Sequence, residues 1–182
     1  MFKPLKIIDE KNKVLRQISK DVTFPLDKKT KDTIEHIITH LTYSQIEDKA
    51  EKYDLRPGMG LSFVQLGILK RIIVIVDEYE EGKFENYIVI NPKIVSNSKE
   101  MIAAEVGEGC LSVNREVEGH VKRFARVTIE GYDIEGNKIR IRAREELSIA
   151  FQHEIDHLNG ILFYDRIDKN KPFYNENELR LI

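Results

Sequence analysis

The chain has 182 residues, of which 33% are charged, and its formal net charge is −2. This length suits one domain, residues 1–182, with a single core, and the near-balance of charges indicates neither a nucleic-acid nor a membrane surface. The one cysteine excludes an internal disulfide, and neither a signal peptide nor an apolar run near the ~18 residues of a membrane span is evident, so we expect a cytoplasmic protein.

The first third of the chain predicts one long helix. Residues 1–27 carry scattered apolar positions broken by charges, which indicates an irregular or short-helical segment. Over residues 27–52 apolar side chains recur at helical spacing, which predicts an amphipathic helix packed on a sheet. Two glycines follow in Pro57-Gly58-Met59-Gly60, where the backbone can take torsions or close approaches that a Cβ atom forbids.

The middle of the chain is rich in short β-type runs. Residues 71–77 and 87–91 predict one hairpin, and residues 126–132 and 138–142 predict a second. Further strands are expected at residues 93–98 and 115–122, and the alternating tail, residues 178–182, is expected to add an edge strand. Strands therefore outnumber helices, and we predict an α+β fold with mostly antiparallel sheets around a central metal-binding helix.

The chemical signal lies in His153-Glu154-Ile155-Asp156-His157. Acids at the start of the surrounding apolar run and Gly160 after it predict a helix here. Residues four apart lie on one helix face, so both imidazoles can bind one metal ion, and Glu154 beside them can act as a proton shuttle. The alternative is a pair of histidines that only make hydrogen bonds inside a buried helix.

A metal held by two histidines needs a third ligand. Glu176 and Glu178 follow His157 by 19 and 21 residues and would make a glutamate-type zinc metallopeptidase. Cys110, the single thiol, is the other candidate. A non-catalytic metal-binding domain would need a fourth ligand, for which His120 is the spare histidine.

Three stretches together resemble the motifs of bacterial peptide deformylases. They are Gly58–Gln65, Glu108–Ser112 and Gln152–His157, in the order of that family, and the residues after the second motif resemble the longer class of Gram-positive bacteria and their relatives. The first motif departs from the family at Ser62 and Phe63, where two alanines are usual. A phenyl ring in place of a methyl group predicts a change in local packing and in pocket shape.

The resemblance implies a metal-dependent hydrolase that removes the formyl group from the N-terminal formylmethionine of newly synthesised proteins and releases formate. The site residues that it implies are the metal ligands Cys110, His153 and His157, the general acid–base Glu154, and the oxyanion donors Gln65 and Leu111. The implied metal is one Fe2+ ion, although Zn2+, Ni2+ or Co2+ would also suit thiolate and imidazole ligands.

The implied partners are N-formylmethionyl nascent peptides, met at the ribosome exit by a monomeric enzyme that does not itself bind nucleic acid or membrane. Ile149 precedes His153 by one helical turn and is our choice for the wall of the methionine pocket. Gly60 would present its backbone to the peptide. Arg115 would bind the peptide, unless it is an ordinary arginine on a strand surface.

Overall fold

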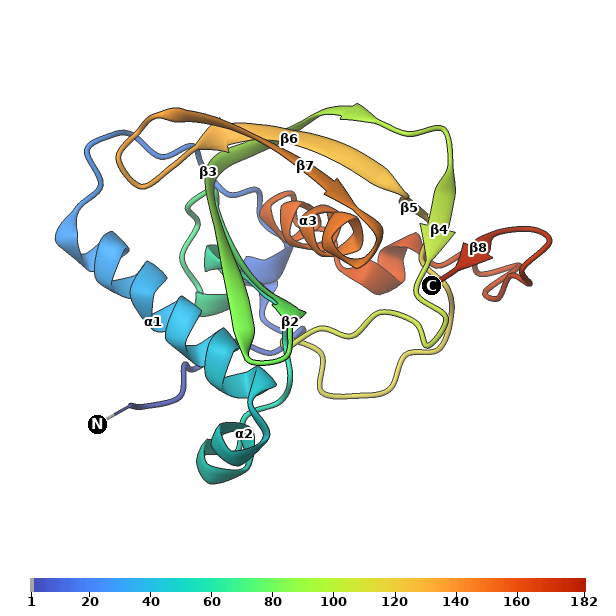
Figure 1. Cartoon of the computed structure of the whole chain (residues 1–182), viewed down its shortest axis with the longest axis horizontal. Coiled ribbons are helices and arrows are strands. Elements are labelled where there is room, and N and C mark those ends of the chain that lie inside the picture. The colour runs from blue at the N-terminus through green and yellow to red at the C-terminus, as the bar shows by residue number, and fades with distance from the viewer. Residues whose placement is uncertain (1) are drawn as a thin grey trace.

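A five-stranded antiparallel sheet organises the protein, and its far strands arch over helix α3 (Figure 1). The computed structural model describes residues 2–182, so Met1, the first residue of the predicted N-terminal segment, lies outside the described residues. The strand order is β1-β2-β3-β6-β7. The bounds are β1 Gly60–Ser62, β2 Ile72–Glu80, β3 Lys83–Asn97, β6 Arg126–Tyr132 and β7 Lys138–Arg144. Both predicted hairpins, and the α+β class with mostly antiparallel pairing, are confirmed.

A second, three-stranded sheet lies beside the first, with the order β5-β4-β8. Its strands are β4 Met101–Ala103, β5 Arg123–Phe124 and β8 Arg180–Leu181. The chain tail thus adds an edge strand, as predicted, and pairs parallel to β4. Figure 1 shows β8 at the right, with the irregular segment between β4 and β5 running below α3.

One strand prediction was confirmed with changed bounds, and one was wrong. Residues 93–97 are in a strand, as predicted, but they continue β3, which changes partner from β2 to β6 through irregular register near Lys93 and Ser96. Residues 115–122 form no strand, because the segment turns at Gly119, with φ +130°, and is tied to the tail by a bond from His120 N to Pro172 O. Its apolar residues pack on Phe163 instead of on a sheet.

The predicted helix over residues 27–52 is two helices, α1 Lys28–Gln45 and α2 Glu47–Tyr53, separated by extended backbone at Ile46. Asp27 caps α1 by accepting a bond of 2.7 Å from Thr30 N. Helix α3, Glu145–Leu158, has the predicted place and ends before Gly160, with φ +74°. Short 3-10 helices occupy Lys13–Arg16, Phe63–Leu66 and Phe163–Arg166.

Core side chains cover both faces of β2. Val74 and Val76 pack with Ile37 and Leu41 of α1 on one face. The opposite face carries a cluster that includes Ile73, Ile75 and, from α3, Phe151, Ile155 and Leu158. A strand buried on both faces reads as a continuous apolar run, as β2 does. Helix α3 is therefore fixed along one side by the core.

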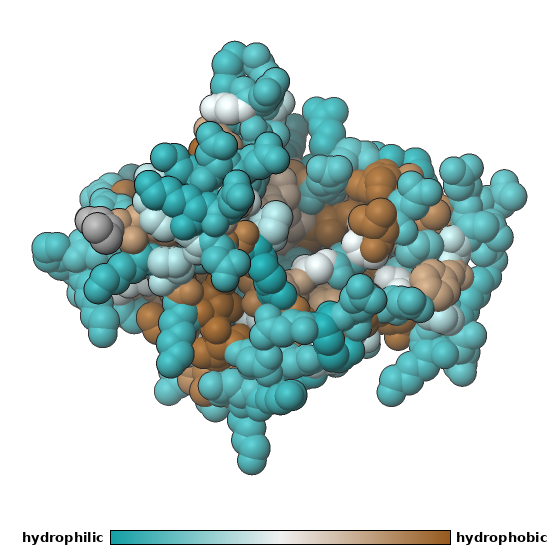
Figure 2. Space-filling model, turned by 90° about the horizontal axis from the view of Figure 1, so that it is seen from below, coloured by the Kyte–Doolittle hydropathy of each residue, from teal (hydrophilic) through white to brown (hydrophobic). Residues whose placement is uncertain are grey.

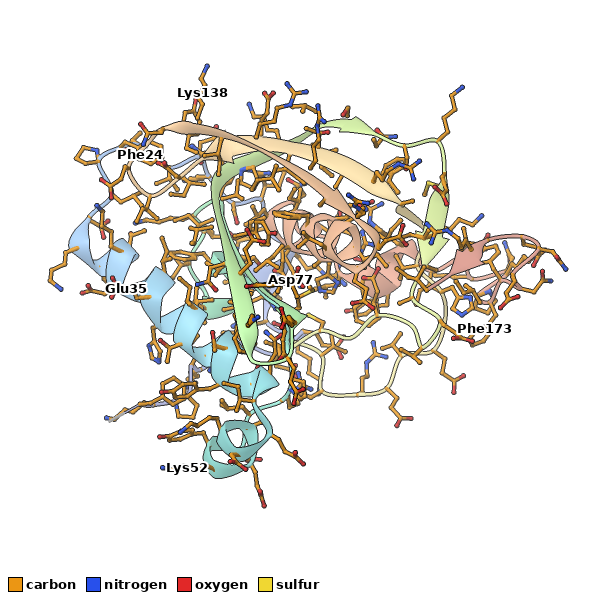
Figure 3. The ribbon with its side chains drawn as sticks, in the orientation of Figure 1. Phe24, Glu35, Lys52, Asp77, Lys138 and Phe173 are labelled. Atoms are coloured by element: carbon orange, nitrogen blue, oxygen red, sulfur yellow. The ribbon has the colours of Figure 1, made fainter. Side chains whose placement is uncertain are left out.

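The N-terminal segment packs against the hairpin of β6 and β7. Phe24 packs on Tyr132, with ring centroids 5.5 Å apart, and lies against Gly136 in the turn between β6 and β7. Lys138 projects outward from β7 beside it (Figure 3). Within residues 2–182, no helix combines the length and the apolar character needed to cross a membrane.

Candidate metal centre and active site

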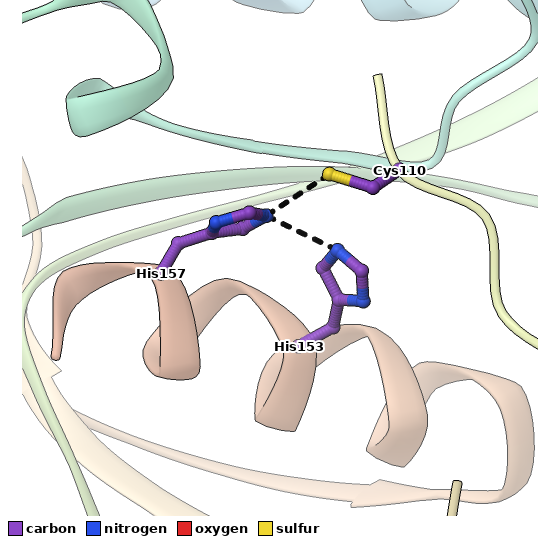
Figure 4. A group of neighbouring side chains, drawn as sticks. All are labelled: Cys110, His153 and His157. Carbon is purple, nitrogen blue, oxygen red and sulfur yellow. Dashed lines mark hydrogen bonds between the residues drawn. The ribbon is translucent and has the colours of Figure 1, made fainter. Parts of the chain in front are cut away.

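The three predicted ligands meet at one point (Figure 4). Cys110 comes from residues 104–122, which we call the cysteine loop, and both histidines come from α3. Nε2 of His157 lies 3.2 Å from Sγ of Cys110 and 3.2 Å from Nε2 of His153. All three ligand atoms lie within 4.8 Å of one another. One thiol and two imidazoles form a set that binds a divalent transition metal and leaves a coordination position open.

The environment of the histidines fits metal binding. Burial lowers the pKa of His157 well below its usual value, so this ring is neutral and keeps a lone pair. Nε2 of His153, Nε2 of His157 and Sγ of Cys110 face one another, and hydrogen bonds among them cannot use all of their lone pairs. One cation between them would accept a lone pair from each atom. The residues present therefore fit the metal that the resemblance implies.

Glu108 fixes the orientation of His153. Its Oε2 lies 2.8 Å from Nδ1 of His153, and Arg123 donates two bonds, of 2.7 and 2.9 Å, to the same carboxylate. Burial by itself raises the pKa of Glu108, but the hydrogen bonds from Arg123 and His153 outweigh it and lower this pKa to about 2. An ionised carboxylate at Nδ1 holds the proton there and leaves Nε2 free for the metal.

Arg123 also joins Glu108 to α3, which we call the metal helix because it carries both histidines. Its guanidinium, only 2% exposed, also donates a bond of 2.6 Å to Asp156, between the two histidines. Arg166 reaches the same Asp156 carboxylate from the outside, with two bonds of 2.5 Å. The cysteine loop and α3 are thus joined by a buried chain of charges next to the ligands.

Glu154 lies in the wall of the cavity that leads to the ligands. It is 4% exposed, burial raises its pKa to about 7, and its Oε2 has no hydrogen-bond partner within the described chain. A Cβ atom on Gly60 would lie 2.7 Å from Oε1 of Glu154. The second glycine of the first motif is therefore needed for the close approach of β1 to this carboxylate.

Gln65 points its amide nitrogen at the thiol. Nε2 lies 3.6 Å from Sγ of Cys110 and donates to the Ser112 hydroxyl at 3.2 Å. The amide oxygen accepts bonds from the backbone N–H and the hydroxyl of Ser62, at 2.9 and 3.0 Å. Ser62 thus fixes the Gln65 rotamer. Phe63 is 1% exposed and packs in the core on the α1 side, and it is not among the residues that line the cavity.

A cavity of about 1130 Å³ opens from the ligand set. Leu111, Ile149, Val117, Phe173 and Ile182 supply part of its apolar lining. The face of the molecule seen in Figure 2 is hollowed, with apolar side chains in the recess and hydrophilic side chains around it. A recess of this kind, ending at metal ligands, suits a substrate with an apolar side chain.

Comparisons with known proteins decide the family. The family model described as polypeptide deformylase matches residues 4–173. The chain belongs to this family. Peptide deformylase of Shouchella clausii is 48% identical over 162 residues, covering 89% of this chain and 88% of the relative. Peptide deformylase of Listeria welshimeri is 44% identical over 168 residues and covers 92% of each chain.

A solved structure agrees with the sequence relatives. Peptide deformylase from Thermotoga maritima matches with a TM-score of 0.72 at 32% identity, covering 91% of this chain and 98% of that one. The resemblance seen in the three motifs is confirmed, including the similarity to enzymes of Gram-positive bacteria. The deformylase is a metal-dependent hydrolase, and its possible metal site is the Cys110, His153 and His157 set.

The other ligand candidates of the deformylase lie elsewhere. Glu178 accepts a bond from Asn175 N at 3.2 Å and pairs with Lys171, and Glu176 is exposed. Both ring nitrogens of His120 are occupied, Nδ1 by Tyr174 N at 3.0 Å and Nε2 by the Glu105 carbonyl at 3.2 Å. Among residues 2–182, the cysteine and two histidines are the one group that could hold an ion.

The remaining predicted residues line the same cavity. Ile149 is 8% exposed in its wall, and Gly60 and Arg115 also border it. The Arg115 guanidinium is bound to Glu10, at 2.8 Å from Nε to Oε1. Leu111 follows the cysteine, and its carbonyl accepts a bond of 2.6 Å from Arg56.

Sequence analysis missed the arginines of the deformylase site. Arg56 also donates to the carbonyls of Cys110, at 2.9 Å, and Val113, at 3.0 Å, so it holds the backbone on both sides of Leu111. Arg123 holds Glu108, as described above. Arg56 lies in an irregular segment and Arg123 in a strand of two residues, so neither carries a periodic signal, and only the folded chain brings them to these acceptors.

Proposed function

We propose that this deformylase removes the formyl group of N-formylmethionyl nascent peptides by hydrolysis and releases formate. The observation that supports this most is the meeting of Cys110, His153 and His157 at the end of an apolar cavity whose wall contains Glu154. A closed structural metal site would neither need the cavity nor keep in its wall a buried carboxylate with one oxygen, Oε2, lacking a hydrogen-bond partner.

Cys110, His153 and His157 would hold the metal, for which we propose Fe2+. A divalent ion bound there would supply Lewis-acid chemistry to the formyl carbonyl and to water. Zn2+, Ni2+ and Co2+ suit the same ligands, because neutral imidazole and thiolate bind all of these ions.

Glu154 and the oxyanion donors supply the chemistry of the chain itself. The Glu154 carboxylate accepts a proton from the attacking water and returns it to the departing amine nitrogen. The Gln65 amide and the backbone N–H of Leu111 donate to the oxyanion that develops on the formyl carbonyl. Loss of one such donor typically costs ~2.7 to 4 kcal/mol of transition-state stabilisation.

The substrate lies along the cavity with its methionine side chain inward. Ile149 forms the wall for that side chain, since it lies one turn before His153 on the same helix. Gly60 presents the backbone of β1 to the peptide, and the open end of the cavity takes the residues that follow methionine. We infer that the monomeric enzyme works in the cytoplasm on chains that leave the ribosome.

The experiment is formate release from a formyl-Met peptide by protein that is purified without oxygen, with metal content measured on the same sample. We expect formate from the formyl-Met peptide and no acetate from its acetyl-Met analogue. Glu154→Gln should keep the metal and lower kcat by at least ~10²-fold, because an amide cannot accept the proton. Metal-loaded protein that releases no formate, or a Glu154→Gln variant that keeps substantial kcat, would contradict the proposal.

A further inference from the structure

One stretch near the N-terminus touches the first motif, the loop that carries the second, and the chain directly after the third. Residues 8–19, which we call the N-terminal strap, carry a short 3-10 helix, Lys13–Arg16, and are otherwise irregular. The strap bonds to the backbone of the Gln65 turn, to the cysteine loop and to the end of α3. These three segments are far apart in sequence, so the strap is a physical link between them.

The first two contacts are backbone hydrogen bonds. The N–H of Ile8 donates to the carbonyl of Gln65 at 2.9 Å, and the N–H of Glu10, two residues on, donates to the carbonyl of Ser112 at 2.8 Å. Gln65 carries the proposed oxyanion amide, and Ser112 follows Cys110 by two residues. The strap therefore connects the Gln65 turn to the cysteine loop, the two segments between which Gln65 Nε2 approaches the Cys110 thiol.

Side chains reinforce the contact with the cysteine loop. Asn114 donates to Asp9 at 2.9 Å, and Arg115 donates two bonds to the Glu10 carboxylate, at 2.8 and 3.2 Å. The Glu10 side chain is 11% exposed and the Arg115 side chain is 53% exposed, so the carboxylate of this bidentate pair is shielded from water and the guanidinium is half open to it. The Arg115 guanidinium also lies over the Tyr164 ring, 5.1 Å from its centroid.

The third contact is with the end of the metal helix. The N–H of Ser19 donates to the carbonyl of Leu158 at 2.9 Å. Arg16 donates to the Tyr164 hydroxyl at 3.0 Å, and the backbone of Arg16 approaches Gly160 so closely that a Cβ there would lie 2.7 Å from the Arg16 carbonyl oxygen. Tyr164 thus contacts Arg16 from the strap and Arg115 from the cysteine loop.

This geometry matters because the cysteine loop contains no helix or strand that could fix its position. Arg56 and the Glu108–Arg123 pair hold the loop near Cys110, and the strap contacts it further along, at Ser112 and Arg115. Displacing a reacting group by about 1 Å can cost ~10²-fold in rate. A link that fixes the position of the loop relative to Gln65 is therefore expected to raise kcat, because it keeps the reacting groups aligned in the transition state.

We propose that Glu10 and Arg115 are positioning residues for the deformylation site, acting together through the strap. Arg115 then serves the reaction by holding the cysteine loop and not by binding the peptide. This inference rests on the proposed function, because its kinetic test needs formate release.

The test is a double-mutant cycle of Glu10→Ala, Arg115→Ala and the double variant, each fully loaded with metal. We expect each single variant to lower kcat by roughly 10-fold, which is ~1.4 kcal/mol, with KM within twofold of the wild type. The double variant should be no slower than the worse single variant, because both remove the same contact. Glu130→Ala, which breaks the exposed Arg140–Glu130 pair on the sheet, is the matched control and should leave kcat unchanged.

A second readout does not depend on activity. A chelator in excess should remove the metal from both single variants at the same raised rate, and from the Glu130→Ala control at the wild-type rate. If Arg115→Ala raises KM while Glu10→Ala behaves as the wild type, or if the two losses add, the positioning role is wrong. A wild-type protein that releases no formate refutes the proposed function instead. The rates of metal loss to the chelator then still test whether Glu10 and Arg115 hold the cysteine loop in place.

Discussion

Gly60→Ala tests how closely β1 approaches the proposed acid–base. A Cβ at this position would lie 2.7 Å from Oε1, 2.9 Å from Cγ and 3.0 Å from Cδ of Glu154, whereas ordinary contact begins near 3.4 Å. The carboxylate must therefore move by about 0.7 Å, since β1 is held in register by Ile75 and its neighbours. Displacements near 1 Å cost up to ~10²-fold in rate, so we expect kcat to fall by roughly 10- to 100-fold.

The assay compares formate release, metal content and urea unfolding. Gly60→Ala should retain its metal and unfold near the wild-type midpoint, because the atoms that must move belong to one side chain. Gly82→Ala is the matched control: its φ of +71° predicts about 1 kcal/mol of destabilisation, but nothing lies within 4 Å of the added methyl and kcat should not change. A Gly60→Ala enzyme with kcat within twofold of the wild type would refute the proposed position of Glu154.

Three further changes separate the roles of the site residues. Gln65→Leu should lower kcat with metal retained and KM little changed, because its amide acts on charge present mainly in the transition state; a change in KM alone would make it a substrate contact. Elemental analysis should find little or no metal in Cys110→Ser and a normal metal content in Glu178→Ala, because Glu178 pairs with Lys171 and is not in the ligand group. Arg123→Met should cost about 3 to 5 kcal/mol in urea unfolding, because it leaves buried Glu108 without its cation; a loss under 1 kcal/mol would contradict this.

The metal helix could be predicted because its signals are local. The spacing of His153 and His157 places both rings on one face, and Gly160 ends the helix, whatever the rest of the chain does. Both hairpins could be predicted for the same reason, because β-type runs flank short turns. The proposed third ligand needed more than spacing: spacing left Cys110, Glu176 and Glu178 open, the family resemblance implies Cys110, and in the fold Cys110 lies with the two histidines.

The parts that could not be predicted depend on contacts between distant residues. Residues 115–122 have the composition of a strand, but Gly119 and the bond from His120 to the tail give them an irregular path. Arg123 lies in a short strand, and nothing local to it predicts acceptors 15 and 33 residues away. A polar side chain that is buried shows its role only when its partners are known.

The register of β1 shows why the fold and the chemistry cannot be separated in this protein. Gly60 pairs with Ile75 and Ser62 pairs with Ile73, so both face α3, whereas Leu61 faces the α1 core. Side chains alternate along a strand, and a slip of one residue would turn Leu61 toward Glu154 and Ser62 away from Gln65. The bulk of Leu61 and the lack of a side chain at Gly60 therefore select the same register, one through the core and the other through the site. A deformylase with the correct motif but a shifted β1 would keep His153, Glu154 and His157 on α3, but Leu61 would press on the Glu154 carboxylate and Gln65 would lose its position.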